Sequence, residues 1–191
     1  MLFRSLDLDA IREDSAHAWL DDAGGPRHPA DGQTQPLLEK TDAYTWNKAP
    51  RLAGAVLETG AIARQLIAGQ PLLRDAVARC SATVYTRLLA RLLELAQVVP
   101  LMESWLIALR PGEPYYRAAA LPDKGRAVGL TEAARGALGH WLEVEHGKIS
   151  RYQIIAPTTW NFSPRDAQGQ PGALEQALQE IGRASCRERV S

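Results

Sequence analysis

The sequence has little cysteine: two residues, Cys80 and Cys186, stand far apart in a chain of 191 residues. Their separation matches no metal-ligand spacing, so neither a disulfide framework nor a thiolate metal site can be argued from them. A lone cysteine in a helical context is most often a small buried hydrophobe, and we expect this of Cys80.

An excess of charge and a long apolar run are also missing. The 22 basic and 22 acidic side chains cancel, so nothing indicates electrostatic capture of nucleic acid or of an anionic membrane. No run of 18 apolar residues is present, and the first residues lack the charged and apolar regions of a secretory signal. We therefore expect a soluble, cytoplasmic protein, or a piece of one, without direct membrane insertion.

The strongest helical signal lies between residues 72 and 110. A chain with 46% hydrophobic residues is long enough for one domain with a sizeable core. In this stretch apolar residues recur every three or four positions, which predicts one continuous helical face made of Val84, Leu88, Leu92, Leu95, Val99, Met102, Leu106 and Leu109. We interpret it as a core helix of a bundle, kinked or divided by Pro100, with Arg87, Arg91 and Glu94 decorating its other side.

The remaining segments give weaker signals. Residues 1–50 look irregular, with a helical turn or two over 11–20, and residues 115–128 look like a linker. Helical spacing is weak over residues 52–67, and an amphipathic helix starts at residue 173. Because Pro50 disfavours helix before it, we expect Lys48 and Arg51 on a loop.

A β-hairpin is predicted after Arg135. Apolar residues alternate from Leu138 to Val144, His146-Gly147 suits a tight turn, and residues 149–156 form the partner strand. The alternative is a helix over residues 131–140, which two glycines would weaken. The predicted fold class is therefore mainly α with a β-hairpin (α+β).

Two groups are candidates for chemistry. Arg135, among small residues at the start of a strand, would present five donors and a permanent charge; the alternative is a surface ion pair with Glu132 or Glu143. Thr158 offers a hydroxyl group, and Pro157 would fix the backbone that orients it. The alternative is that the Pro-Thr pair simply forms a turn. His140 could be a ligand, but a lone histidine on a strand is more often a hydrogen-bonded core residue.

Three motifs give the chain a resemblance to a known family. Tyr44-Thr-Trp-Asn-Lys-Ala-Pro-Arg51, an Arg-Gly-x-Leu-x-His motif beginning at Arg135, and Pro157-Thr-Thr-Trp-Asn-Phe-Ser-Pro-Arg165 occur in order. Over nearly all of residues 1–180 the chain resembles the large subunit of nickel–iron hydrogenases. The resemblance implies a fragment of that subunit's helical bundle fold, with Lys48 and Arg51 in a buried polar network.

The resemblance also implies roles for four residues. Arg135 would overhang a nickel–iron centre that carries two cyanides and a carbon monoxide, act as base for heterolytic H2 cleavage and bond to one cyanide. Thr158, aimed by Pro157, would donate to the second cyanide. Ile154 matches a position whose backbone carbonyl is a Mg²⁺ ligand in the family.

The sequence departs from the family pattern in several places. Leu57-Glu-Thr-Gly-Ala-Ile-Ala-Arg64 differs at Thr59, Ala61 and Ile62 from the usual Glu-Val-Gly-Pro-Leu-Ala-Arg. The two Cys-x-x-Cys pairs that hold the family's metal are missing, so we expect this chain alone to bind no nickel and to be inactive. Ala134 stands where many catalytic members have proline, which favours the uptake or hydrogen-sensing branch.

The last eleven residues are predicted to differ in origin from the rest of the chain. Residues 181–191 resemble the translation of a sequencing adapter, which leaves residues 1–180 as the hydrogenase fragment and makes Cys186 non-biological. The resemblance implies a parent that passes electrons from H2 to iron–sulfur clusters on a small subunit, with membrane association only through partner subunits. Two alternatives are a hydrogen sensor and a metal-free scaffold subunit of a respiratory complex.

Overall fold

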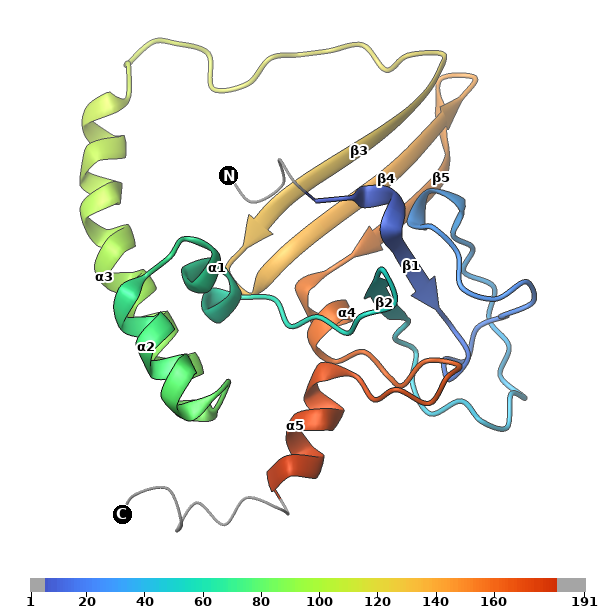
Figure 1. Cartoon of the computed structure of the whole chain (residues 1–191). Coiled ribbons are helices and arrows are strands. Elements are labelled where there is room, and N and C mark those ends of the chain that lie inside the picture. The colour runs from blue at the N-terminus through green and yellow to red at the C-terminus, as the bar shows by residue number, and fades with distance from the viewer. Residues whose placement is uncertain (1–5, 182–191) are drawn as a thin grey trace.

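The computed structural model describes residues 6–181, which form a mixed α+β fold of five α-helices and two small sheets (Figure 1). This confirms the predicted α+β class. The helices are α1 (Ala61–Ile67), α2 (Pro71–Cys80), α3 (Val84–Ala108), α4 (Pro157–Asn161) and α5 (Ala173–Ile181). The strands are β1 (Ile11–Asp14), β2 (Ala49–Leu52), β3 (Lys124–Ala133), β4 (Gly136–Glu145) and β5 (Lys148–Ile155).

The larger sheet is an antiparallel meander of order β3-β4-β5. Its β4–β5 half is the predicted hairpin, closed by a turn in which His146 and Gly147 have φ values of 52° and 65°. Two consecutive positive φ values are typical of a tight hairpin turn, and glycine adopts them without steric cost. The hairpin prediction is confirmed, and no helix forms over residues 131–140.

The sequence does not predict β3, which begins inside the stretch expected to be a linker. β3 pairs with β4 along its whole length, from Lys124 opposite Glu145 to Ala133 opposite Gly136. It is an edge strand and most of its residues are exposed. An edge strand of this kind needs no apolar alternation, because its pairing with β4 defines it.

The smaller sheet pairs β1 with β2, with Ile11 opposite Leu52 and Asp14 opposite Ala49. Two expectations are therefore wrong: residues 11–20 contain no helix, and Arg51 lies in a strand rather than on a loop. Three of the four β1 residues are buried. Three of the four residues are charged, so the strand shows neither the apolar alternation nor the helical period on which sequence prediction depends.

The helical stretch is divided at a cap and not at its proline. After α2, Ser81 takes a φ of 58°, and the Thr83 side chain accepts a hydrogen bond from the Thr86 amide at 3.4 Å. α3 then continues through Pro100 as one helix of 25 residues. Pro100 is exposed, so water can satisfy the carbonyl group that the proline leaves without a partner. No helix in the described range is long and apolar enough to cross a membrane.

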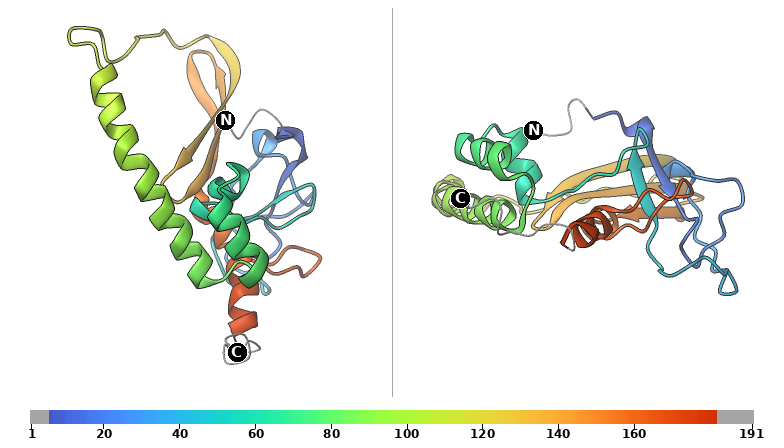
Figure 2. Two further views of the ribbon diagram at one scale, coloured as in Figure 1. Left: turned by 60° about the vertical axis from the view of Figure 1, so that its left-hand side comes forward. Right: turned by 60° about the horizontal axis from the view of Figure 1, so that its bottom comes forward.

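The predicted apolar face of α3 is exposed rather than buried. Its eight side chains, from Val84 to Leu109, are 52% to 68% exposed. α1 and α2 pack instead on the side that bears Thr86 and Ala90, both 0% exposed. Figure 2 shows α3 at one side of the molecule with the shorter helices along one flank only. The bundle-core interpretation is therefore wrong for this chain by itself.

Two hydrophobic clusters form the core. One joins both sheets to α4 through Ile11, Trp141, Ile155 and Trp160, and the other lies where α1, α2 and α3 meet. Cys80, expected to be buried, is exposed at the end of α2 because the helix presents Leu73 and Ala76 to the core instead.

Candidate functional site

A cavity of about 180 Å³ lies where α1, α3, α4 and the turn between β3 and β4 meet. The end of β3 stands beside α1 and near α4 in Figure 1. The cavity is lined by Glu58, Thr59, Gly60, Ala61, Ile62, Arg87, Arg91, Ala134, Arg135, Thr158, Asn161 and Phe162. The structure thus brings the predicted residues Arg135 and Thr158, which come from different elements, to one cavity.

Arg135 lies in the two-residue turn that joins β3 to β4. Its side chain is exposed, and it makes no hydrogen bond or ion pair with any residue in the range 6–181. The alternative, an ion pair with Glu132 or Glu143, does not occur, since both carboxylates bind other arginines at 2.8 Å. The guanidinium group is therefore available to whatever occupies the cavity.

The backbone around Arg135 is packed tightly against the loop before α1. Gly136 has a φ of 135°, and a Cβ atom there would lie 2.3 Å from Thr59 Oγ1. Gly60 has a φ of 127°, and a Cβ atom there would lie 3.1 Å from the Arg135 carbonyl oxygen. L-residues rarely adopt such φ values. Both positions therefore require glycine. The close approach that they allow determines where the Arg135 turn lies relative to the cavity.

Thr158 reaches the cavity from the first turn of α4. The helix begins at Pro157, whose missing amide proton costs nothing at that position. Ile155 before it is 0% exposed and Trp160 after it is 7% exposed, so both ends of this segment are anchored in the core. Thr158 itself is exposed, and its hydroxyl makes no hydrogen bond within the described range. The Pro-Thr pair thus starts a short helix instead of forming an isolated turn.

Asn161 holds α4 against the loop that contains Thr59. Its Oδ1 accepts a hydrogen bond from the Thr59 amide (2.8 Å), and its Nδ2 donates to the Thr59 carbonyl (3.0 Å). The Thr59 hydroxyl is buried and has no partner among the described residues. The sequence gives Asn161 no role beyond its place in the motif from Pro157 to Arg165, because its partner lies 102 residues earlier.

Sequence reasoning also missed the arginines that α3 contributes. Arg87 donates to both carboxylate oxygens of Glu58, at 2.6 and 2.8 Å, and Arg91 lines the same cavity. The sequence does contain a signal for them. Arg87, Arg91 and Glu94 are spaced four and three residues apart, and this spacing places the three charges on one face of a helix. Three guanidinium groups and one carboxylate give the cavity wall an excess of positive charge, which favours a small anionic group.

Ile154, the fourth predicted site residue, does not line this cavity. It lies on β5 opposite His140, and its side chain is 47% exposed. His140 is a partly buried, hydrogen-bonded histidine, with Nδ1 2.7 Å from the Tyr152 hydroxyl and the two rings stacked. The role of the Ile154 carbonyl stays a prediction.

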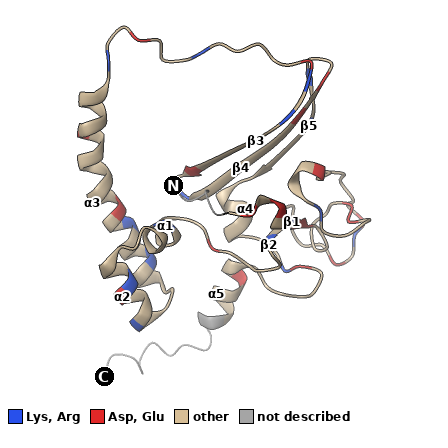
Figure 3. Cartoon of the chain, turned by 45° about the horizontal axis from the view of Figure 1, so that its top comes forward, with Lys and Arg blue, Asp and Glu red and all other residues tan. Residues whose placement is uncertain are grey.

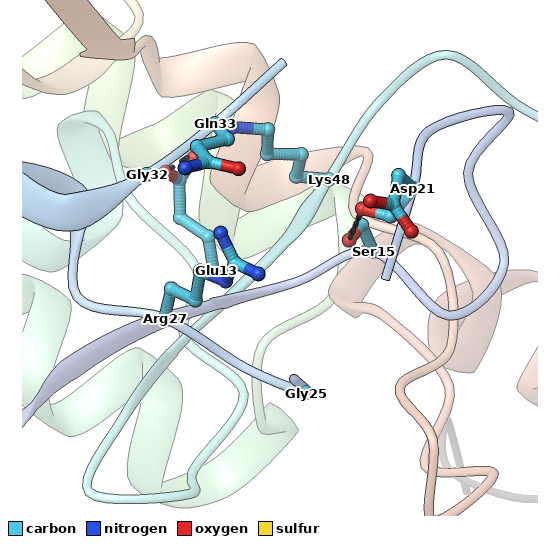
Figure 4. A pocket seen from close by; sticks show the side chains of 8 residues that line it. All are labelled: Glu13, Ser15, Asp21, Gly25, Arg27, Gly32, Gln33 and Lys48. Atoms are coloured by element: carbon cyan, nitrogen blue, oxygen red, sulfur yellow. Dashed lines mark hydrogen bonds and ion pairs between the residues drawn. The ribbon is translucent and has the colours of Figure 1, made fainter. Parts of the chain in front are cut away.

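A second cavity, of about 20 Å³, lies beside β1 and is large enough for one water molecule. Figure 4 shows the side chains that line it, among them Glu13 and Lys48. Lys48 Nζ donates to Gln153 Oε1 at 2.9 Å and lies 3.5 Å from Glu13 Oε2. Burial raises the pKa of Glu13, and the attraction of Lys48 opposes this only in part.

Arg51 forms a buried ion pair. Arg51 is 4% and Asp166 3% exposed, and Arg51 Nε donates to Asp166 Oδ2 at 2.9 Å. The guanidinium group also donates to the Pro164 and Gln170 carbonyls. Lys48 and Arg51 thus both make buried polar contacts, which tie the β2 region to β5 and to the segment after α4.

The described residues supply donors for an anionic group but no metal-ligand set. Between residues 6 and 181, no group of three or more His, Cys, Asp or Glu side chains could hold a metal ion. Cys186 and the predicted adapter-derived residues after Ile181 lie outside the described range.

Comparison with known families gives a direct match. A family model described as nickel-dependent hydrogenase matches residues 2–190. Among curated proteins, the chain is 34% identical to the Hydrogenase-1 large chain of Escherichia coli (strain K12), covering 91% of this chain and 36% of that protein. It is also 34% identical to the periplasmic [NiFeSe] hydrogenase large subunit of Desulfomicrobium baculatum, covering 90% of this chain and 37% of that protein.

Solved structures agree with these matches. The fold superposes on the Ni-Fe-Se hydrogenase from D. vulgaris Hildenborough in the reduced state with a TM-score of 0.82 and 32% identity. That superposition covers 91% of this chain and 40% of the hydrogenase chain. The chain therefore spans well under half the length of the relatives that it matches.

Proposed function

This chain belongs to the nickel-dependent hydrogenase family, and we propose that it is part of a large subunit whose complete protein splits H2 into protons and electrons. The observation that carries the proposal is the cavity that Arg135 and Thr158 share. Both side chains are free of partners among the described residues, and the two come from separate elements whose backbones are tightly anchored.

The residues present fit the outer surroundings of a nickel–iron centre with cyanide and carbon monoxide ligands. The excess of guanidinium groups and the free Thr158 hydroxyl suit small anionic ligands. Thiolate ligands would come from Cys-x-x-Cys pairs elsewhere in the complete protein, since Cys80 is exposed and no group of three or more His, Cys, Asp or Glu side chains between residues 6 and 181 could hold a metal ion. When bound, the centre would supply the site at which H2 is polarised and its electrons are accepted.

Arg135 would handle the proton. A guanidinium group has too high a pKa for an ordinary base, so it would first have to give a proton to solvent; the neutral nitrogen formed transiently, held directly against H2, would then take up the proton of heterolytic cleavage. The turn geometry supports this role, because the Arg135 backbone is fixed while its side chain has no partner within residues 6–181. Thr158 would donate to a cyanide, and Pro157 would fix the backbone from which it does so.

The exposed apolar face of α3 supports further parts of the proposal. We propose that the remainder of the large subunit covers this face and completes a helical bundle, and that an iron–sulfur small subunit receives the electrons. The complete protein would reside in the cytoplasm, with any membrane association through partner subunits. A Mg²⁺ ion at the Ile154 carbonyl and membership of the uptake or hydrogen-sensing branch remain parts of this proposal.

The test uses the complete reading frame, purified with its small subunit. H2-dependent dye reduction should fall by about 100-fold or more in Arg135→Lys and by a smaller factor in Thr158→Val, with nickel content retained. Thr131→Val, an exposed threonine on the neighbouring strand, is the matched control and should leave the rate unchanged.

Two outcomes would contradict the proposal. A complete reading frame without cysteine pairs at both ends would favour the metal-free scaffold instead. Residues 1–191 alone should show no stoichiometric nickel by elemental analysis, and tightly bound nickel in that chain would overturn the assignment of the ligands to other parts of the protein.

A further inference from the structure

Arg64 lies outside the cavity wall but contacts the turn that carries Arg135. It extends from α1 with its side chain 16% exposed, and its five N–H groups have five acceptors. Nε and Nη2 donate to the two carboxylate oxygens of Glu94 on α3, at 2.6 and 2.8 Å. Nη1 donates to Glu132 Oε2 at 2.8 Å.

The remaining two hydrogen bonds go to the backbone directly before Arg135. Nη1 donates to the Ala133 carbonyl at 2.9 Å and Nη2 donates to the Ala134 carbonyl at 3.2 Å. The Ala134 carbonyl belongs to the peptide group that Arg135 completes. A rotation of that peptide group would therefore change the direction in which the Arg135 side chain leaves the turn.

The turn has few other supports. β3 is an edge strand, and Ala134 and Arg135 are both exposed. On the far side of Arg135, Gly136 pairs with Ala133 across the hairpin and closely approaches Gly60 and Thr59. On the side before Arg135, the hydrogen bonds of Arg64 hold the backbone of the turn. Glu94 in turn holds Arg64 against α3, the helix that contributes Arg87 and Arg91 to the cavity.

From this arrangement we propose that Arg64 is a positioning residue for Arg135: it sets the distance and direction of the catalytic guanidinium group without touching the substrate. The inference rests on the proposed function of Arg135. A lysine cannot replace Arg64, since three donors on one nitrogen cannot span a bidentate carboxylate, a second carboxylate and two carbonyl groups. Loss of Arg64 should leave the fold intact, because Glu94 and Glu132 are about a quarter exposed and can be solvated.

The experiment uses the complete large subunit with its small subunit and four variants: Arg64→Met, Arg64→Lys, Arg135→Lys and the double variant Arg64→Met/Arg135→Lys. Arg64→Met should lower kcat about 10- to 100-fold with little change in the KM for H2, and Arg64→Lys should lower it less. Nickel and iron content should match the wild type. The double variant should be no slower than Arg135→Lys alone. The reason is that Arg64 acts only through the Arg135 guanidinium group, which is already absent in Arg135→Lys.

A measurement other than turnover completes the test. The infrared bands of the cyanide ligands should shift in Arg64→Met in the same direction as in Arg135→Lys, since both changes weaken the same hydrogen bond. Arg126→Met, which removes another arginine–glutamate pair from β3, is the matched control and should change neither the rate nor the bands.

The outcomes separate the two proposals. A wild-type enzyme that fails to oxidise H2 would contradict the proposed function, independently of the results for the Arg64 variants. An active wild type with an unaffected Arg64→Met, or with additive losses in the double variant, would overturn the positioning role alone. If Arg64→Met loses its metals, Glu94→Gln is the milder variant: it should keep them and lower kcat, and loss of metals there too would assign Arg64 a purely structural role.

Discussion

At the scale of single residues, the site is defined by which polar side chains are paired and which are not. Glu58 is bound to Arg87, and Glu132 to Arg64, so these charges are committed to the scaffold. Arg135 and Thr158 have no such partner between residues 6 and 181. A free guanidinium group and a free hydroxyl at one positively charged cavity are suited to bind and orient a small anionic group.

Glu13 gives a pH-dependent prediction. Its pKa is raised by burial above the unfolded value of 4.5. The resulting stabilisation is fully present below pH 4.5, where both states are protonated, and is lost as the pH rises through the folded pKa. The wild-type chain should therefore lose stability relative to Glu13→Gln as the pH rises above 4.5 through the raised pKa of Glu13.

Urea denaturation at several pH values measures this difference. Glu39→Gln, at an exposed position, is the control and should track the wild type at every pH. A stability difference between wild type and Glu13→Gln that is constant with pH, or that changes in the opposite direction, would contradict the prediction.

The residues of the candidate site could be predicted from the sequence only where they belong to a recognisable motif. The motifs identified Arg135 and Thr158, and the structure brings both to one cavity. Asn161, Arg87 and Arg91 were missed because their function depends on partners or neighbours that are distant in sequence. Arg64 was noted only as part of a pattern, since nothing local shows that its side chain meets the turn before Arg135.

At the scale of secondary-structure elements, the close approach of two loops determines where the Arg135 turn lies. Gly136→Ala should destabilise the chain by about 2 kcal/mol or more, because alanine at a φ of 135° is strained and its Cβ would overlap Thr59. Urea denaturation measures the loss. Gly129→Ala is the control, since a Cβ atom on that β3 glycine meets nothing within 4 Å; equal effects at both sites would contradict the prediction.

The buried pair of Arg51 and Asp166 gives a second prediction at this scale. Arg51→Met should cost about 3 to 5 kcal/mol, because Asp166 would remain buried without its cation. Arg79→Met, which breaks an exposed pair within α2, should leave the urea midpoint nearly unchanged. A small effect of Arg51→Met would mean that the segment after α4 can open and solvate Asp166.

A helix or strand could be predicted where the spacing of its apolar residues matched the pattern of its burial. The β4–β5 hairpin alternates and turns at His146-Gly147, so it was found. β3 was missed because an exposed edge strand carries little pattern, and β1 because three of its four residues are charged. The helical stretch was found, but its break at Ser81 depends on cap geometry, which apolar spacing does not report.

At the scale of the whole molecule, the apolar face of α3 is the main departure from expectation. The ribbon of α3 in Figure 3 has little of the red or blue that marks charged residues, and Glu103 is the only charged residue from Leu95 to Ala108. Contiguous exposed apolar surface of this kind promotes association.

The purified chain should therefore self-associate in sedimentation velocity experiments. Leu92→Glu together with Leu95→Glu should shift it towards monomer, whereas Leu38→Glu, at an exposed loop position, should not. A wild-type chain that remains monomeric at every concentration would show that this face is covered in solution by some other part of the chain.

The two hydrogen bonds between Asn161 and Thr59 also bear on when the site forms during synthesis. The loop before α1, then α3, then the Arg135 turn leave the ribosome in that order, but the wall supplied by α4 is made last. Contacts across 102 residues cannot form before the later partner has been synthesised. The cavity is therefore open on one side until α4 has been synthesised, long after the loop before α1 and α3.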